Sequence, residues 1–259
     1  MKLLPVPESI KPFVKDIFML ESDEEDKVND YPFYADCFPG IIYSNSTNPF
    51  YLHPGNKKLS DFYLYGQTIE PITLSTKGPF RLYCMRLFPF AARILLGVDP
   101  KLLNDDCYDL KLVENINTDE TLEKLFQTDD VNSVLEVLAD YFNELLQEAS
   151  FNPDYRIKLA INLILKTSGT VSIKELRERL SVAERTLERQ FVKEIGVTPK
   201  QFAKIIRFSS SMKQLTEAEY VNLTDISYDS GFADQSHFIR SFKRYTGKTP
   251  KEFQKQLSA

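Results

Sequence analysis

The sequence has 259 residues, of which 42% are hydrophobic and 27% charged, as in a globular protein of one large domain or two smaller ones. No apolar run is long enough to span a membrane, and Met1–Glu8 lacks the features of a signal peptide, so we expect a cytoplasmic protein without a membrane partner. Residues 1–154 carry 13 Lys and Arg against 26 Asp and Glu, whereas residues 155–259 carry 19 against 11. A basic module joined to an acidic one is typical of a nucleic-acid-binding protein with a separate control domain.

Aromatic and β-branched residues dominate residues 1–88 and predict strands. Proline, glycine and asparagine separate the segments of this character, which are Phe50–His53, Phe62–Tyr65, Pro71–Thr76 and Phe80–Phe88. The acidic stretch Glu21–Asp30 contains few apolar residues and is predicted to be an exposed loop. A short helix is expected to begin near Pro89 and to end at Gly97.

Helical periodicity begins at Thr118. Helices are predicted at Asp119–Phe126, at Val131–Ala149 and from Asn152-Pro153 to about Thr167. We place the domain boundary here. The expected fold class is α+β, with a β-rich regulatory or dimerisation domain at residues 1–154 that ends in helices, and an all-α domain at residues 155–259.

The C-terminal region contains an internal repeat at an offset of 51 residues. Leu187–Phe202 and Phe238–Phe253 are identical at seven of sixteen positions. In the first copy the shared residues are Arg189, Phe191, Gly196, Thr198, Pro199, Lys200 and Phe202. A match of this density within one chain indicates a duplicated structural unit.

The first copy is preceded by a short helix and a tight turn. Ser172 is expected to cap that helix, with Glu175 three residues later as its partner. A turn through Ser181-Val182 leads to the second helix, at about Ala183–Ile195. Two short helices joined in this way predict a helix-turn-helix, whose second helix enters the major groove of DNA.

The second copy has the same organisation. Leu223–Ser230 is predicted as its first helix, Gly231-Phe232 as its turn, and Asp234 as the cap of a helix that runs through Tyr245. Between the copies, Pro199 to about Leu215 is predicted as one helix. It would act as a rigid spacer, because successive major grooves on one face of DNA lie about 34 Å apart.

The second helix of each unit presents polar side chains on the face opposite its apolar residues. The apolar face consists of Leu187, Phe191 and Ile195 in the first unit and of Phe238, Phe242 and Tyr245 in the second. The outward side chains are Arg185, Glu188 and Arg189, and Gln235, Ser236, Ile239, Arg240 and Lys243. Arginine can bind guanine, glutamine adenine, and glutamate cytosine. An ordinary solvated face is the alternative, and an arginine at the same repeat position in both helices disfavours it.

These motifs resemble the AraC/XylS family of transcriptional regulators. The resemblance covers about residues 155–257 and rests on Ser172–Leu176, Arg185–Phe191, Gly196–Lys200 and Gly231–Pro250. It implies an all-helical domain that binds two adjacent major-groove segments. By position, the base contacts would be Arg185, Glu188, Arg189, Gln235, Ser236 and Arg240. We assign phosphate contacts to Ser172, His237 and Lys243.

The remaining features extend and qualify this resemblance. The N-terminal half is similar to a sensor-like domain of one subgroup of the family, through Phe38–Tyr43 and Phe88–Gly97. Where the family usually has a small residue in the first helix of each unit, this chain has Arg177 and Ser227, and the first turn has Ser181 instead of glycine. Arg177 is therefore expected to loosen the first unit.

The sequence predicts neither catalysis nor a bound metal or cofactor. The two histidines, His53 and His237, are far apart, and we expect the first to lie in a loop. The cysteines, Cys37, Cys84 and Cys107, lack the paired spacing of a zinc site, and their odd number suits a reducing compartment. Cys84 is expected to be a buried apolar residue, and acidic neighbours are expected to disfavour ionisation of Cys107.

Double-stranded DNA is the expected partner. The sequence does not determine what regulates DNA binding. Nine of the thirteen tyrosines lie in residues 1–154, where they either line an effector pocket or form an ordinary core. RNA polymerase and a second copy of the chain are further candidate partners. A DNA-binding module fused to a cysteine-dependent alkyl-repair enzyme, and an N-terminal domain that serves only dimerisation, are the competing hypotheses.

Overall fold

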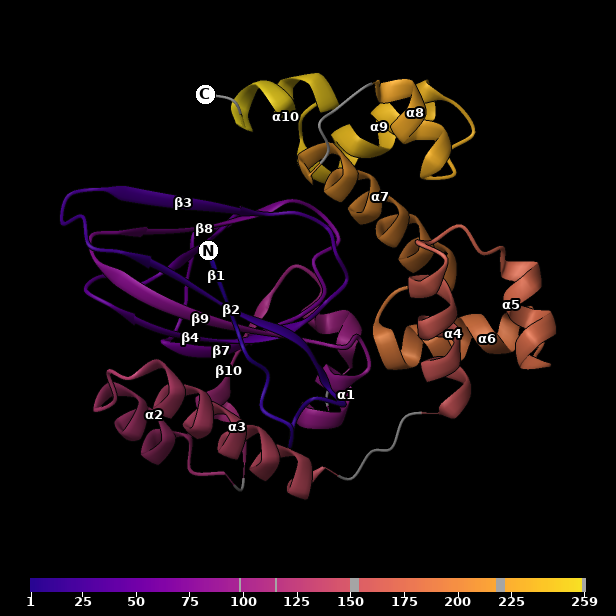
Figure 1. The fold of residues 1–259 in the computed structure, drawn as a ribbon. Coiled ribbons are helices and arrows are strands. Elements are labelled where there is room, and N and C mark those ends of the chain that lie inside the picture. Colours follow the sequence, from indigo (N-terminus) through magenta and orange to yellow (C-terminus); the bar gives the residue numbers. More distant parts are fainter. Residues whose placement is uncertain (98, 115, 150–153, 218–221, 258–259) are drawn as a thin grey trace. The chain divides into compact units, whose positions relative to one another are not determined.

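The computed structural model describes residues 1–97, 99–114, 116–149, 154–217 and 222–257, and forms two compact units (Figure 1). The N-terminal unit comprises Met1–Phe33, Phe38–Gln67 and Ile72–Pro153. The C-terminal unit comprises Tyr34–Cys37, Thr68–Pro71 and Asp154–Ala259. The helix start predicted at Asn152-Pro153 lies outside the described residues, so the domain boundary at residue 154 stays a prediction.

The N-terminal unit contains two antiparallel sheets. The six-stranded sheet has the order β1-β2-β9-β4-β7-β10 and the four-stranded sheet the order β3-β8-β5-β6. The strands are β1 (Lys2–Leu4), β2 (Val14–Ser22), β3 (Val28–Phe33), β4 (Gly40–Ser46), β5 (Tyr51–His53), β6 (Lys57–Lys58), β7 (Phe62–Tyr65), β8 (Ile72–Lys77), β9 (Phe80–Leu87) and β10 (Cys107–Asp109). All four segments predicted as strands are confirmed.

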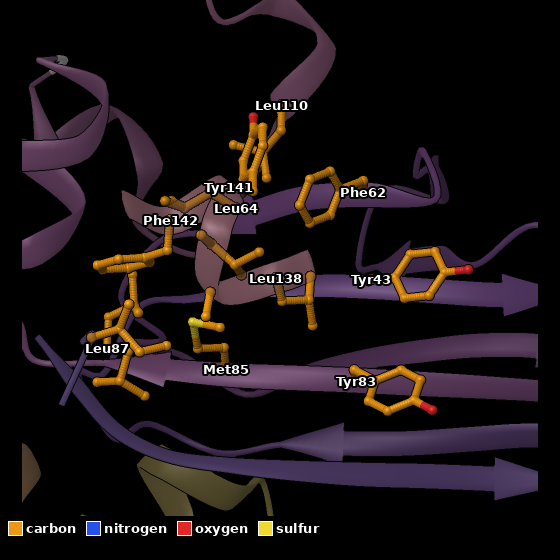
Figure 2. Close-up of a cluster of buried hydrophobic side chains, with 14 of the residues drawn as sticks. Tyr43, Phe62, Leu64, Tyr83, Met85, Leu87, Leu110, Leu138, Tyr141 and Phe142 are labelled. Atoms are coloured by element: carbon orange, nitrogen blue, oxygen red, sulfur yellow. The ribbon is translucent and has the colours of Figure 1, made fainter. Parts of the chain in front are cut away.

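Alternating side chains of the six-stranded sheet enter two different cores, because neighbouring residues of a strand point to opposite faces. On β4, Ile42 packs with residues of the four-stranded sheet, such as Leu74. Ile41 and Tyr43 belong to the other core, together with residues of the helices, such as Leu138 and Phe142 (Figure 2). The sheet is therefore covered on both faces.

Three helices belong to this unit: α1 (Ala91–Leu96), α2 (Thr118–Phe126) and α3 (Val131–Glu148). Gly97 ends α1 in the left-handed conformation, as the sequence predicts, with φ of 65°. The side chains of Asn117 and Asp130 cap α2 and α3. Two short 3₁₀ helices, Pro100–Leu103 and Leu110–Leu112, flank β10.

The prediction of an exposed loop at Glu21–Asp30 is wrong at both ends. Strand β2 extends to Ser22, which pairs with Phe80 of β9, and β3 already begins at Val28. Asn29 is 4% exposed and donates a hydrogen bond to the carbonyl oxygen of Gly78 over 3.4 Å. Distant strands supply these partners, so local polarity does not reveal them.

The described part of the C-terminal unit after Asp154 is helical. Its helices are α4 (Tyr155–Lys166), α5 (Ile173–Leu180), α6 (Glu184–Ile195), α7 (Pro199–Glu217), α8 (Leu223–Asp229), α9 (Gln235–Thr246) and α10 (Pro250–Leu257). The predicted α+β class is confirmed. Among the described helices of both units, none has the length and apolar character needed to cross a membrane.

Candidate nucleic-acid interface

Helices α5 and α6 form the first helix-turn-helix. The hydroxyl oxygen of Ser172 accepts a hydrogen bond from the backbone N–H of Glu175 over 3.1 Å, so the predicted cap is confirmed. Ser181 takes the left-handed conformation with φ of 50°. The next backbone N–H, of Val182, donates to the carbonyl oxygen of Arg177 over 3.2 Å and closes the turn.

Helices α8 and α9 form the second helix-turn-helix with the same turn chemistry. Gly231 has φ of 72°, and the N–H of Phe232 donates to the carbonyl oxygen of Ser227 over 2.9 Å. The carboxylate of Asp234 then accepts a hydrogen bond from the N–H of His237 over 2.7 Å, so it caps α9 as predicted. Ser181 and Gly231 therefore occupy equivalent turn positions, and the serine adopts a conformation that glycine takes more readily.

Arg177 is accommodated in the first unit by an ion pair. Its Nη1 lies 3.0 Å from the carboxylate of Glu184, the first residue of α6. The pair joins the two helices of the unit, whereas Nε of Arg177 is buried and makes no hydrogen bond within the described residues. The expected loosening of the first unit stays a prediction. At the equivalent position Ser227 is fully buried, and its hydroxyl makes no hydrogen bond to the described residues.

Aromatic packing explains two of the seven identities in the repeat. The rings of Phe191 and Phe202 lie 5.5 Å apart in the first copy, and those of Phe242 and Phe253 lie 5.4 Å apart in the second. All four side chains are buried. The repeat thus conserves one aromatic contact between the recognition helix and the helix that follows it.

Backbone requirements explain three more identities. Gly196 and Gly247 end the recognition helices with φ of 87° and 74°. Thr198 and Thr249 then cap α7 and α10, because each hydroxyl oxygen accepts a backbone N–H from three residues later. A proline follows each threonine at the first helical position, which needs no backbone donor.

The two remaining identities are basic and have no structural explanation. Arg189 and Arg240 are exposed on α6 and α9, and Lys200 and Lys251 are exposed in the first turns of α7 and α10. A helix N-terminus carries partial positive charge, so a lysine there is unfavourable for the helix itself. The packing of the C-terminal unit therefore leaves one arginine and one lysine per copy available to a ligand.

The predicted base contacts lie on the outer faces of the recognition helices. Arg185, Glu188 and Arg189 are exposed on α6; Ser236 and Arg240 are exposed on α9, where Gln235 is half-buried. Within the described residues, none of the three arginines makes an ion pair, whereas Arg156 and Arg179 of the same unit pair with Asp154 and Glu175. Unpaired guanidinium groups on both helices suit an anionic ligand.

The three predicted phosphate contacts differ in their surroundings. Lys243 is exposed near the end of α9. The Ser172 side chain is exposed, and its hydroxyl proton stays free to donate while the oxygen caps α5. His237 is half-buried, with its ring edge-on to Phe232 at 5.4 Å, so its ring has less freedom to reach a ligand.

Helix α7 connects the two helix-turn-helix units. It covers Pro199–Glu217 and so runs past the predicted end at about Leu215. It packs against α4, α6, α8, α9 and α10. Its buried side chains include Phe202, Ile205, Ile206 and Phe208. The predicted spacer is therefore also the core of the C-terminal unit.

The cysteines and histidines form no reactive cluster in the described part of the chain. All three cysteines are buried and reduced. Burial raises the pKa of the Cys107 thiol to about 12, and the charge of Asp106 adds to the shift. The expectation that His53 lies in a loop is wrong, because His53 ends β5 and pairs with Thr73 of β8. Its Nε2 lies 2.7 Å from the hydroxyl of Ser75. No group of metal-binding side chains is found among the described residues.

Residues 176–256 match a family described as a helix-turn-helix domain, and residues 2–109 match a domain of unknown function. The HTH-type transcriptional activator RhaS of Yersinia pestis (strain Pestoides F) is 34% identical over 90 residues, which are 35% of this chain and 33% of RhaS. This chain therefore spans about a third of the length of the curated relatives that it matches.

The fold as a whole is similar to that of a protein of known structure. ToxT from Vibrio cholerae shows a TM-score of 0.53 at 16% identity, covering 94% of this chain and 98% of ToxT. A crystal structure of ToxT from strain SCE256 with a bound unsaturated fatty acid shows a TM-score of 0.50 at 16% identity, covering 92% and 94%. At these identities the likeness concerns the fold alone.

Proposed function

Because this chain belongs to the AraC/XylS family by its C-terminal helices, we propose that it is a sequence-specific DNA-binding transcription regulator. In this proposal α6 and α9 enter two neighbouring major-groove segments of double-stranded DNA. One observation carries the proposal. Arg189 and Arg240 occupy the same repeat position on the two recognition helices, both are exposed, and the packing of the unit does not explain their identity.

The outward side chains divide into two roles under this proposal. Base recognition falls to Arg185, Glu188 and Arg189 in one groove segment and to Gln235, Ser236 and Arg240 in the next. Phosphate contacts fall to Ser172, His237 and Lys243, which fix the register of the protein on the duplex. We add Lys200 and Lys251, whose positions in the first turns of α7 and α10 are equivalent in the two copies.

Footprinting of the full-length protein on its preferred DNA tests the two-groove arrangement. The preferred sequence is first obtained by selection from random duplexes. We expect two protected segments about one helical turn apart on one face of the duplex. Arg189→Ala should weaken protection and base preference in one segment, and Arg240→Ala in the other.

Lys213→Ala is the matched control for these variants. Lys213 is an exposed cation of the same unit, but it lies on α7 and pairs with Glu217 over 3.7 Å. Its removal should leave the footprint unchanged. Protection of a single segment by the wild-type protein, or equal effects of all three variants, would contradict the proposal.

We further propose that a ligand or a protein partner acting on the N-terminal unit controls DNA binding. A relative in fold, ToxT, has been crystallised with an unsaturated fatty acid, which supports a small-molecule effector as one form of this control. Contact with RNA polymerase and formation of a homodimer are the other two forms. Since chromosomal DNA is the proposed target, we also propose a cytoplasmic location.

A further inference from the structure

Ile239 is an apolar residue on the outer face of the second recognition helix. Of the five side chains that the sequence places outward on α9, it alone is apolar. We propose that Ile239 covers the methyl group of a thymine in the major groove, so that the protein prefers thymine at one position of its second groove segment. This inference rests on the proposed function, in which α9 enters that segment, and it names a base that the helix selects.

The internal repeat gives Ile239 a counterpart in the first helix-turn-helix. At the offset of the repeat, Ile239 corresponds to Glu188. The next residues, Arg240 and Arg189, are identical and exposed in both copies. Glu188 is exposed on α6 and is one of the proposed base contacts of that helix. A base contact by Glu188 therefore predicts a base contact by Ile239, with a side chain of different chemistry.

The neighbours of Ile239 on α9 are the residues proposed to contact DNA. Ile239 follows Ser236 by three positions and Gln235 by four, so the three side chains are adjacent on the helix surface. Arg240 is the next residue, and Lys243 lies one turn further along the same face. A duplex bound to these polar side chains therefore also covers Ile239.

The packing of the C-terminal unit does not account for an isoleucine at this position. Ile239 is half-buried. The buried side chains of α9 are Phe238, Phe242, Tyr245 and Thr246. The exposed glutamate at the equivalent position of α6 shows that the fold needs no apolar residue here, and glutamate also favours a helix more than isoleucine does. Part of the hydrocarbon surface of Ile239 is thus available to a ligand.

The chemistry of the two side chains selects two different pyrimidines. The C5 methyl of thymine is the apolar group on the major-groove edge of a base pair, and the amino group of cytosine lies on the adjacent ring atom. The carboxylate of Glu188 can accept a hydrogen bond from that amino group. Ile239 would leave the amino group without a partner, whereas it gains free energy by removing the thymine methyl from water. Glu188 therefore suits cytosine, and Ile239 suits thymine.

Replacement of thymine by deoxyuridine in the DNA tests this contact, because uracil lacks only the methyl group. The preferred duplex of the full-length protein is first obtained by selection. Each thymine in the segment that depends on Arg240 is then replaced in turn. We expect at least one replacement to weaken wild-type binding by about fourfold, the effect of one methyl group moved from an apolar contact into water. Ile239→Ala should bind that duplex and its uracil counterpart equally.

Ile173→Ala is the matched control. Ile173 is also a half-buried isoleucine of the C-terminal unit, but it lies on α5. This variant should keep the fourfold preference for the methyl group, whatever its overall affinity. A purely structural role of Ile239 would weaken Ile239→Ala on both duplexes alike and leave the preference at fourfold. That result overturns the proposal, as does a wild-type protein that binds every uracil duplex as well as the thymine duplex.

Exchange of the two side chains tests which base each one selects. Ile239→Glu should change the preferred base from thymine to cytosine at the methyl-dependent position, and Glu188→Ile should make the reverse change in the other segment. Each new side chain already stands at the equivalent position of the other helix, so we expect both variants to fold. Circular dichroism verifies this. Unchanged base preferences in two folded variants would overturn the proposal.

Failure of this inference can be told apart from failure of the proposed function. If the wild-type protein selects no preferred duplex, or if Arg240→Ala leaves its base preference unchanged, the proposed function is wrong and the role of Ile239 falls with it. If Arg240→Ala alters the base preference while no uracil replacement has an effect, the role of Ile239 alone is overturned.

Discussion

The guanidinium of Arg207 donates a hydrogen bond from Nη2 to the carbonyl oxygen of Gly169 over 2.8 Å and so ties α7 to the turn that precedes the first helix-turn-helix. The same guanidinium lies 5.9 Å from the ring centre of Phe232, in the turn of the second helix-turn-helix. Next to Gly169, the side chain of Thr170 approaches Gly231 so closely that a Cβ there would lie 2.7 Å from its methyl carbon. One turn and one arginine therefore join the two helix-turn-helix units within the C-terminal unit.

Gly169→Ala should destabilise the C-terminal unit. Gly169 has φ of 74°, and a Cβ at this position would lie 2.1 Å from the carbonyl oxygen of Ala203 on α7. The backbone must shift to relieve this clash, so we expect the free energy of unfolding to fall by more than about 2 kcal/mol. Urea unfolding of the full-length protein, followed by its helical circular dichroism signal, measures the change.

Gly247→Ala separates the clash from the cost of the left-handed backbone. Gly247 has the same φ of 74°, but nothing lies within 4 Å of its added Cβ. Its substitution should therefore cost only about 1 kcal/mol. Equal losses for the two variants would show that the approach of α7 to Gly169 is not tight.

Ser227→Ala should stabilise the protein by about 1 kcal/mol. The Ser227 hydroxyl, on α8, is fully buried and makes no hydrogen bond within the described residues. Its removal relieves a desolvated polar group without breaking a bond. Thr224→Ala, on the same helix but half-buried, is a suitable control for changes in helix propensity. A loss of stability in Ser227→Ala alone would reveal a partner for the hydroxyl, such as a buried water.

Arg240→Ala and Lys243→Ala should weaken DNA binding in different ways. As a base contact, Arg240 should contribute about 1–3 kcal/mol at the preferred site and little on random DNA. As a phosphate contact, Lys243 should contribute nearly equally on all sequences, and its loss should reduce the salt dependence by about one ion. Titrations of specific and random duplexes at several salt concentrations distinguish the two roles.

Lys200→Gln and Lys251→Gln extend this experiment to the two unexplained lysines of the repeat. Each should behave as Lys243→Ala does, with a smaller salt dependence and unchanged sequence preference. Unchanged binding in both variants would remove these lysines from the interface. A change of sequence preference would move them to the base contacts.

Stability should fall as the pH rises above about 9. Burial raises the pKa of Cys107 to about 12 from an ordinary value of 9.0, and that of Tyr141 to about 12 from 10.0. Each group stays neutral in the folded protein while it ionises in the unfolded chain, so its contribution is complete below the unfolded pKa and is lost as the pH rises toward 12. The slope can reach about 1.4 kcal/mol per pH unit for each group.

Two variants measure how much Cys107 and Tyr141 each contribute to this pH dependence of the free energy of unfolding. In urea unfolding at a series of pH values, Cys107→Ala should flatten the curve from about pH 9, whereas Tyr141→Phe should act only above about pH 10. A Cys107→Ala variant with the wild-type slope between pH 9 and pH 10 would mean that the thiol is not desolvated in the folded protein.

The sequence by itself determined most of the C-terminal unit, because helices depend on neighbours along the chain. The cap at Ser172, the helix end at Ile195 and the buried face around Phe191 all rest on contacts within a few residues, and all are as predicted. The repeat added the pairing of two helix-turn-helix units. The final helix, Pro250–Leu257, was not predicted, although Thr249-Pro250 repeats the start of α7.

Only the tertiary structure decided the features that depend on distant partners. Strand pairing extended β2 into the stretch predicted as a loop, and it placed Tyr43 beside Tyr83, forty residues later in the chain. Strand register and side-chain pairing are set by residues far apart in the sequence, whereas periodicity reports only which face of an element is buried.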